Sequence, residues 1–455
     1  MKKTLRTVLI ALLALFCATA WGQATGEQKK YKVKKKDTIY GIAHKYDLTI
    51  DELLNANPEM KAEGYSLKAG DYVLIPYPST AKVTRPAASA ATAGTRQGAQ
   101  GALQGRHLSV GVLLPLHNND GDGRRMTEYY RGLLMACDSL KAEGLSVDVH
   151  AWNVSIDSDI TQFMPALAAA RCDVVFGPLY SKQVHGLAEF CKARDIKMVI
   201  PFSISGDDVS LYPQIFQVYQ SDDRLANNII ESFLKTFHKA HPVFVDCNDK
   251  TSKKGTFTFG LRTRLESNNI RYGITNVTSS DDAFAKQFSA SQQNVVILNS
   301  ARSPELTQVM NKLASLKAAH PELRLTLFGY TEWLMYLQLD EARFHRFDTY
   351  IPSTFYSNAS DPRTAALSQS YQQWFHTPMQ QALPRFAITG YDQGQFFLRG
   401  LARYGKAFKG TREQNRYRAL QSPLVFKQIS TAGMQNDYLQ LIHFLPNGNI
   451  EALSY

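Results

Sequence analysis

An alternation of apolar runs with amphipathic stretches, beginning at Leu108, most strongly constrains the fold of this chain. The apolar runs are LSVGVLLPL, SVDVHAWNV, CDVVFGPLYS and IKMVIPFSIS, and helical patterns occupy residues 124–143, 159–172 and 182–194 between them. Parallel strands that are buried on both faces have near-continuous Val, Ile and Leu runs of this kind. The pattern therefore predicts an α/β fold with a doubly wound parallel sheet.

The same alternation restarts after the segment QIFQVYQSDDRLANNIIESFL. The later apolar runs are HPVFVDC, RYGITNV, NVVILNS, LRLTLFGY and FDTYIPSTFY, with helical stretches such as residues 304–318 between them. Two successive α/β units of similar length predict two lobes that face a cleft. Open α/β sheets bind ligands at the carboxyl ends of their strands, so each lobe is expected to present those ends to the cleft.

The first 24 residues have the pattern of a secretory signal peptide. Lys2, Lys3 and Arg6 precede an apolar run over residues 8–17, and small residues follow it at two cleavage sites, after Ala20 and after Ala24. We expect a signal peptide at 1–24 and an exported, periplasmic or wall-associated protein. No later apolar run is long enough to span a bilayer. Lipidation at Cys17 is disfavoured, because bulky Phe16 occupies a position where the processing site needs a small residue.

Residues 29–77 form a separate pattern. Tyr31 and Val33 indicate a strand, apolar residues at helical spacing over 39–46 and 50–54 indicate two helices, and Tyr72 and Leu74 indicate a second strand. Residues 78–105 are almost entirely Ala, Thr, Ser, Gly, Gln and Pro, which predicts a flexible linker with a relaxed span of about 30 Å. The expected layout is a small domain at 29–77, a linker at 78–105 and a two-lobed domain at 106–455.

The small pattern resembles a LysM domain, through YKVKKKDTIYGIAHKYDLTIDELLNANP and LKAGDYVLIP. The resemblance implies a βααβ fold that binds polymers of N-acetylglucosamine, such as peptidoglycan, in a groove between two turns. The residues implied to line this groove are Asp37, Thr38, Ile39, Tyr40, Asn57, Pro58 and Glu59. Lys36 stands where the family usually has Gly. Asp37 and Thr38 are also suited to cap a helix, and both tasks are compatible.

Residues 106–405 resemble the type I periplasmic binding proteins, particularly the branched-chain amino-acid receptors. The similar segments are VGVLLPL, VVFGPLYSKQV, MVIPFSIS, VYQSDDRLANNI and ITGYDQGQFFLRGL. The resemblance implies a ligand in the cleft, held by Tyr180, Ser181, Ser203, Ser205 and Gly206 from the first lobe and by Tyr330, Thr331, Glu332 and Tyr356 from the second. Ser181 and Ser205 also suit helix caps, and Tyr330 and Tyr356 also suit packing between lobes. A free amino acid is not favoured, because no acid–amine clamp stands out.

The formal net charge of +11 does not indicate nucleic-acid binding. Seven of the basic residues lie in the signal (Lys2, Lys3, Arg6) or in and beside the linker (Lys82, Arg85, Arg96, Arg106), so the folded parts are only weakly basic. Cys137 falls on the apolar face of a predicted helix and is expected to be a buried free thiol. Cys172 with Cys191 is the only disulfide pairing that the sequence suggests.

The sequence carries no pattern of an enzyme, a metal site or a cofactor site. The eleven histidines form no H-x-H or H-E-x-x-H motif, and no G-x-S-x-G or phosphate-binding loop occurs. The acids Asp207, Asp208, Asp222 and Asp223 come as adjacent pairs, which glycosidase geometry does not require. We therefore expect a non-catalytic protein without a cofactor.

The sequence thus predicts a non-catalytic exported protein that binds peptidoglycan through its LysM domain and a small polar ligand, such as a cell-wall fragment, in its cleft. The alternative is a wall-anchored scaffold or regulator of a wall synthase or hydrolase, with no small-molecule ligand. A receptor for transport fits less well, since a protein held at the wall would deliver its ligand poorly. The residues from Phe408 to Tyr455 are unplaced, although LQLIHFLPNGNIEAL has the pattern of a hairpin with an Asn-Gly turn.

Overall fold

A computed structural model describes most of the chain. The described residues are 29–34, 37, 39, 42, 45–46, 50–61, 67–76, 103–202, 206–359 and 361–455. The predicted signal peptide (1–24) and most of the predicted linker (78–105) lie outside these residues. Contacts divide the chain into one unit from Met1 to Ala88 and another from Ser89 to Tyr455.

The smaller unit is built on a two-stranded sheet. Strand β1 (Lys29–Lys32) pairs antiparallel with β2 (Tyr72–Ile75), and helix α3 (Ile50–Ala56) and the 3-10 turn η1 (Pro58–Lys61) lie between them in the chain. Its buried apolar residues are Tyr31, Val33, Ile42, Leu53, Leu54, Met60, Val73 and Ile75. Ile39, Ile42 and Lys45 are helical, so the predicted strand–helix–helix–strand order is confirmed.

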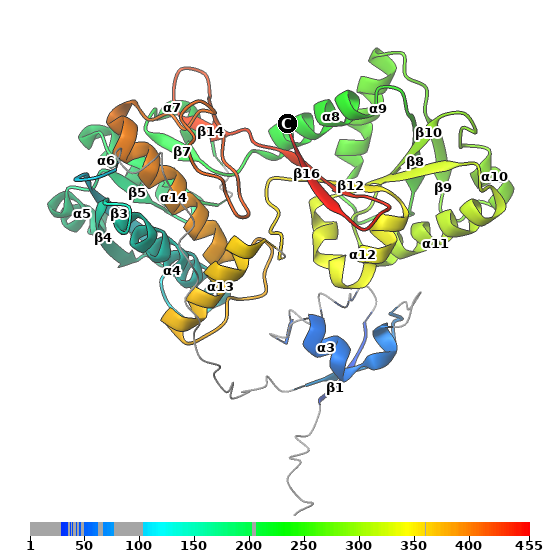
Figure 1. The fold of residues 1–455 in the computed structure, drawn as a ribbon, viewed down its shortest axis with the longest axis horizontal. Coiled ribbons are helices and arrows are strands. Elements are labelled where there is room, and N and C mark those ends of the chain that lie inside the picture. Colours follow the sequence, from blue (N-terminus) through cyan, green and yellow to red (C-terminus); the bar gives the residue numbers. More distant parts are fainter. Residues whose placement is uncertain are drawn as a thin grey trace, which may run out of the picture. The chain divides into compact units, whose positions relative to one another are not determined.

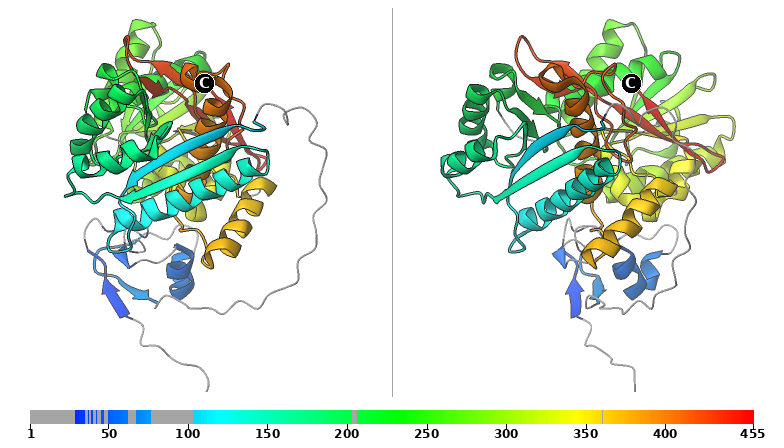
Figure 2. Two further views of the ribbon diagram at one scale, coloured as in Figure 1. Left: turned by 90° about the vertical axis from the view of Figure 1, so that its left-hand side faces the viewer. Right: turned by 60° about the vertical axis from the view of Figure 1, so that its left-hand side comes forward.

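The larger unit contains two seven-stranded sheets, and we call the sheet of β3 to β7 with its helices the first lobe (Figure 1). In sheet order its strands are β13 (Phe426–Gln428), β14 (Met434–Asn436), β7 (Ile215–Gln217), β6 (Lys197–Ile200), β5 (Val174–Phe176), β3 (His107–Leu114) and β4 (Ser146–Asn153). All neighbours are parallel except β13 and β14. Figure 2 shows β3 and β4 side by side, paired from His107 opposite Ser146 to Leu114 opposite Asn153.

The second lobe repeats this arrangement. In sheet order its strands are β16 (Ile450–Ser454), β15 (Gln440–Phe444), β12 (Thr349–Ser353), β11 (Arg324–Phe328), β10 (Gln293–Leu298), β8 (His241–Asp246) and β9 (Gly273–Asn276). The five strands from β12 to β9 are parallel, and the hairpin β15–β16 adds antiparallel to β12. The predicted doubly wound, two-lobed α/β fold and the C-terminal hairpin are both confirmed.

Three described segments join the lobes: residues 218–221, 354–361 (of which 360 is not described) and 437–439. The Gln220 side chain donates to the carbonyl of Tyr438 at 2.9 Å, and Arg224 pairs with Asp437 at 2.7 Å, so the first and third segments are tied together. The residues after Phe408, which the sequence left unplaced, thus supply strands to both lobes.

Helices cover both faces of the first sheet. They are α4 (Gly121–Lys141), α5 (Met164–Ala170), α6 (Val184–Arg194), α7 (Asp208–Leu211), α13 (Pro362–Phe375) and α14 (Phe386–Tyr404). Those of the second lobe are α8 (Asp222–Thr236), α9 (Gly255–Ser267), α10 (Asp281–Ala285), α11 (Ser303–Ala319) and α12 (Leu337–Arg346). In β3, Val110, Val112 and Leu114 belong to the cluster that contains α4 and α14 residues, whereas Leu113 belongs to the cluster with α5 and α6 residues. This alternation is the period of two that a strand imposes.

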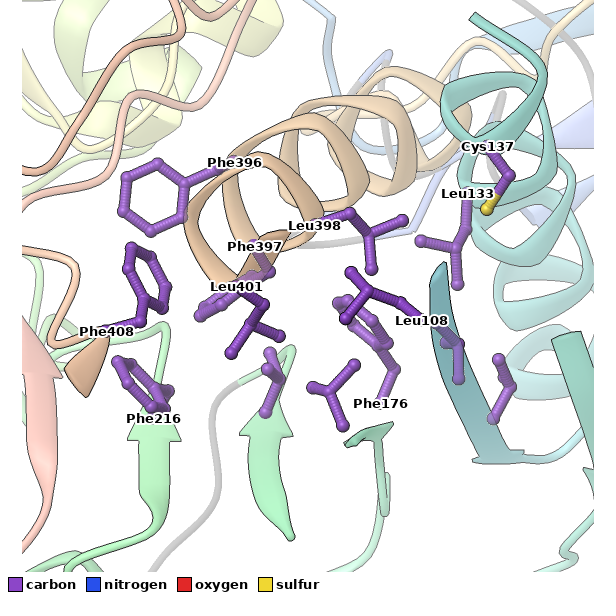
Figure 3. Packing of buried hydrophobic residues seen from close by; sticks show 14 of the residues in the cluster. Leu108, Leu133, Cys137, Phe176, Phe216, Phe396, Phe397, Leu398, Leu401 and Phe408 are labelled. Carbon is purple, nitrogen blue, oxygen red and sulfur yellow. The ribbon is translucent and has the colours of Figure 1, made fainter. Parts of the chain in front are cut away.

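Aromatic residues fill the space between α14 and the first sheet (Figure 3). The Phe397 ring meets Phe176 and Phe216 edge-on, with centroids 5.8 and 5.4 Å apart. The buried thiol of Cys137 lies in the same cluster and is free, as predicted. Cys172 and Cys191 are also free, both in the cluster under α6, so the pairing that the sequence suggested is not formed.

Helices α4 and α14 approach each other at glycines. A Cβ atom added to Gly390 would lie 1.9 Å from the carbonyl oxygen of Tyr129, and one added to Gly132 would lie 1.9 Å from that of Ala387. Because the opposing atoms are backbone, no side-chain rotation can relieve such a contact. The close packing of the two helices therefore requires glycine at both positions.

We predict that Gly390→Ala lowers the free energy of unfolding by about 3 kcal/mol or more, because the added methyl group overpacks a backbone contact. The measurement is urea unfolding of the full chain followed by circular dichroism. Gly255→Ala at the start of α9 is the matched control, since nothing lies within 4 Å of its added Cβ. Equal stability of the two variants would contradict the prediction.

Candidate functional site

In the small unit, Asp37 is fixed by two hydrogen bonds. Its Oδ2 accepts from the Tyr31 hydroxyl and from the Lys34 backbone N–H, both at 2.7 Å. The turn that precedes the predicted glycan groove is therefore held by this carboxylate, and Ile39 is half-buried beside it in the chain. Thr38, Tyr40 and Lys36 lie outside the described residues.

Asn57 ties the second turn to the sheet. Its amide donates to the carbonyls of Leu53 and Leu74 at 2.7 and 2.8 Å and accepts from the Leu74 N–H at 2.7 Å, and the side chain is fully buried. The side chain of Asn57 is thus used within the domain, whereas Pro58 and Glu59 are exposed. Of the predicted groove residues in this turn, only the latter two present side chains to solvent.

In the second lobe, a cavity of about 720 Å³ lies at the carboxyl edge of the sheet. It is lined by residues that follow β8 (Asp249, Thr251 to Lys254), β10 (Ser300 to Arg302) and β11 (Tyr330, Glu332), together with the first turns of α8 and α9. This is the edge at which parallel α/β sheets bind ligands, and the volume suits a small molecule.

Two of the predicted cleft residues, Tyr330 and Glu332, line this cavity. The Lys254 ammonium forms an ion pair with Glu332 at 2.7 Å and lies 4.7 Å from the centre of the Tyr330 ring. The Tyr330 hydroxyl donates to the carbonyl of Leu298, so its ring is the fixed element of the three. The Glu332 side chain is 43% exposed and can be reached from the cavity.

Asp249 organises the part of the cavity wall that follows β8 and β10. Its carboxylate accepts from Thr251 Oγ1 at 2.7 Å and from Ser300 Oγ at 2.8 Å, and Arg302 approaches it at 3.7 Å. Burial alone would raise the pKa of Asp249, but these hydrogen bonds and the charge of Arg302 outweigh it and hold the pKa below its usual range. The cavity wall therefore carries a fixed negative charge beside a partly exposed guanidinium.

The other described cleft residues do not line this cavity. Tyr180 donates to Asp122 at 3.3 Å, and burial followed by the charge of Asp122 raises its pKa to about 12; Ser181 is exposed and begins a 3-10 turn. Thr331 donates to the carbonyl of Pro352 at 2.7 Å. Tyr356 lies in a segment between lobes, where its N–H donates to the carbonyl of Gln421 at 2.8 Å.

In the first lobe, Phe202 directly precedes the segment of the predicted ligand residues Ser203 and Ser205. The Phe202 ring packs against Tyr129, Tyr219 and Phe386, with centroids 5.4, 6.0 and 5.6 Å away. Gly206 is exposed. Ser203 and Ser205 lie outside the described residues.

Sequence reasoning missed Asp249, Lys254 and Arg302. All three follow strands whose positions the apolar runs HPVFVDC and NVVILNS predict, so the rule that ligands bind at carboxyl strand ends would have included them. What the sequence does not contain is the pairing of Lys254 with Glu332, which lie 78 residues apart.

Helix α4 of the first lobe also carries a buried carboxyl group. Glu128 is 2% exposed; its Oε1 accepts from the Gln380 N–H at 2.7 Å, and its Oε2 has no partner among the described residues. Burial raises the pKa of Glu128 to about 7, although the Gln380 hydrogen bond and the charges of Arg131 and Arg385 oppose it. The folded protein thus keeps this carboxyl protonated over a range in which an exposed one is ionised.

Comparisons with known proteins agree with this architecture. The model of the LysM domain matches residues 31–76, and that of the periplasmic binding protein matches residues 138–435. No curated protein matches the chain. Among the described residues, none of the helices has the length and apolar character needed to cross a bilayer.

Solved structures are similar to this chain at low identity. A protein from Rhodospirillum rubrum, described as a branched-chain amino acid ABC transporter, is 17% identical with a TM-score of 0.52 over 76% of this chain and 99% of its own. An ABC transporter substrate-binding protein from Desulfitobacterium hafniense, in complex with Leu, is 14% identical (TM-score 0.40, 76% and 100%). LpoA from Haemophilus influenzae is 13% identical (TM-score 0.48, 78% and 60%).

We predict that Glu128→Gln makes the protein more stable than the parent at pH 8, by up to about 3 kcal/mol, and leaves it unchanged near pH 4.5. The parent binds this proton more tightly when folded, so its stability falls as pH rises from about 4.5 to 7 and then levels off. Urea unfolding across this pH range measures the difference. Glu143→Gln is the control: it breaks the paired hydrogen bonds with Arg399 and should destabilise at pH 8.

Proposed function

The chain belongs to the periplasmic binding protein family, and we propose that it is an exported, non-catalytic protein that binds peptidoglycan through its LysM domain and a small polar ligand in its large domain. Both matched families are binding proteins, which supports a location outside the cytoplasm and a role without catalysis. The proposed location is the periplasm or the cell wall.

The observation that carries the ligand proposal is the cavity at the carboxyl edge of the second sheet. It combines an apolar aromatic surface, Tyr330, with the charged pair of Lys254 and Glu332. A few convergent polar groups on an apolar lining are typical of small-molecule sites. Because both signs of charge are present, the ligand we propose is polar with donors and acceptors, such as a cell-wall fragment.

The alternative is a peptidoglycan-anchored scaffold or regulator of a wall synthase or hydrolase. Exposed apolar side chains favour it, since protein partners bind such surfaces. Leu211 and Phe259 are 61% and 66% exposed. They lie on α7 and α9, in different lobes, and do not form one patch, so we favour the ligand.

We predict that the full chain sediments with insoluble peptidoglycan, and that Ile39→Ser reduces binding about tenfold, since it removes an apolar surface from the groove worth roughly 1.4 kcal/mol. Tyr72→Ser is the matched control, because Tyr72 is 62% exposed on β2 and outside the predicted groove. Equal binding by both variants would place the glycan surface elsewhere. No sedimentation of the parent would refute wall binding.

We predict that one class among wall fragments, amino acids and short peptides raises the unfolding temperature of the full chain, because ligand at 100 times its Kd adds about 2.7 kcal/mol. Glu332→Gln should reduce the rise, since it removes the charge that pairs with Lys254. Glu341→Gln, an exposed glutamate on α12, should leave it unchanged. A parent that shows no rise with any class would favour the scaffold.

A further inference from the structure

A second cavity, of about 580 Å³, lies on the first lobe between α4, α13, α14 and the segment 416–420. We call it the arginine groove, because Arg363, Arg399, Arg416 and Arg418 line it against only two acids, Asp138 and Glu143. Its volume is that of a site for a small ligand. It shares no lining residue with the cavity of the second lobe.

Two of these arginines are engaged within the protein. Arg399 forks onto the carboxylate of Glu143 at 2.7 and 2.5 Å. Arg363 pairs with Asp361 at 2.8 Å and also donates to the carbonyl of Arg418 at 3.1 Å, so it supports the backbone of segment 416–420. Their charges are neutralised, and their geometry holds the groove together.

Arg416 and Arg418 are the free cations of the groove. Both are exposed, and neither forms an ion pair with any residue that the structure describes; Arg416 donates only to the carbonyl of Asn415. Guanidinium groups bind carboxylates in a planar, two-point geometry. An anionic ligand is therefore the chemistry that these two residues favour.

The segment that carries the two arginines is held in place by hydrogen bonds to a buried carboxylate. The buried carboxylate of Asp392 accepts from the Tyr417 hydroxyl at 2.7 Å and from the N–H groups of Leu420, Gln421 and Ser422 at 2.8 to 2.9 Å. The backbone on both sides of Arg418 is thus ordered before any ligand arrives. Such preorganisation lowers the entropy cost of binding.

Trp374 adds a flat apolar surface to the same groove. It lies at the end of α13 and is 47% exposed, which is unusual for a side chain of this size. An indole face buries the apolar face of a pyranose ring, whereas an acidic peptide gains nothing specific from it. The arginines that line the other end of the groove then meet a carboxylate on that ring or its substituent.

We propose that the arginine groove binds a carboxylate-bearing saccharide of one or two sugar units, as a site separate from the LysM groove and from the second-lobe cavity. Trp374 stacks on the sugar, and Arg416 and Arg418 bind its carboxylate. This goes beyond the proposed function, because it assigns the first lobe a ligand of its own.

The test is tryptophan fluorescence of the full chain titrated with muramyl dipeptide, an N-acetylated amino sugar whose dipeptide substituent carries one free carboxylate. Trp374 reports on the groove, because Trp333 is fully buried, Trp152 lies on β4 and Trp21 belongs to the predicted signal peptide. We expect a saturable spectral change that is lost in Trp374→Phe and kept in Trp152→Phe. The double variant Arg416→Ala/Arg418→Ala should weaken the Kd at least tenfold, whereas Arg346→Ala/Arg403→Ala, which removes the same charge elsewhere, should not. Circular dichroism confirms that each variant is folded.

Four outcomes would overturn the proposal: no spectral change from Trp374, an equal affinity for neutral chitotriose, an unaltered Kd in the groove variant, or tighter binding of an acidic decapeptide, which would make the groove a protein contact. Loss of peptidoglycan sedimentation in Ile39→Ser, with the Kd of the arginine groove unchanged, tests the small domain separately. A failure of the proposed wall binding and a failure of this site are therefore distinguishable.

Discussion

The architecture of the large unit depends on one buried carboxylate, Asp392 of α14, which holds the chain segment that follows this helix. It accepts four hydrogen bonds from residues 417–422, which together satisfy both of its oxygens in a dry site. A buried polar group is tolerated only when its hydrogen bonds are made, and removing them leaves an uncompensated cost. From this anchored segment the chain goes on to β13 and β14 of the first sheet and then to β15 and β16 of the second. The anchor therefore fixes the last strands of both lobes.

The helix that carries Asp392 is itself placed by close packing. Gly132 and Gly390 let α4 and α14 approach until backbone meets backbone, and the phenylalanines of α14 then reach Phe176 and Phe216 on the sheet. The packing of α4 against α14 thus determines where α14 lies and therefore where Asp392 lies. Asp392 in turn holds segment 416–420 through its hydrogen bonds. The arginine groove inherits its geometry from these contacts, which hold the backbone that carries its free cations.

The parts of the fold that local pattern encodes could be predicted from the sequence. The runs LSVGVLLPL and HPVFVDC are continuous apolar strands in a parallel sheet, and NGN in the last hairpin specifies its turn. Interactions between distant positions could not be predicted. The sequence holds no local mark of Lys254 meeting Glu332, or of Asn57 turning inward to bind the backbone of Leu53 and Leu74. Candidate residues chosen by resemblance therefore included Asn57, whose side chain is internal, and omitted Asp249 and Lys254, which line a cavity.

The buried and half-buried carboxyl groups of the large unit differ in how fully their oxygens are paired with donors or cations. Asp392, Asp249 and Asp437 are saturated by donors or cations, and each secures a connecting segment. Glu128 is the exception, with one donor for two oxygens. Hydrogen bonds and cations hold the pKa values of Asp249 and Asp437 low against the opposing effect of burial, whereas burial dominates at Glu128 and raises its pKa to about 7. Burial also raises the pKa of Asp392, but that carboxyl has four donors, whereas Glu128 has one; Glu128 lies where α4 meets the loop before α14. Ionisation of Glu128 near pH 7 therefore acts on the first lobe at this contact.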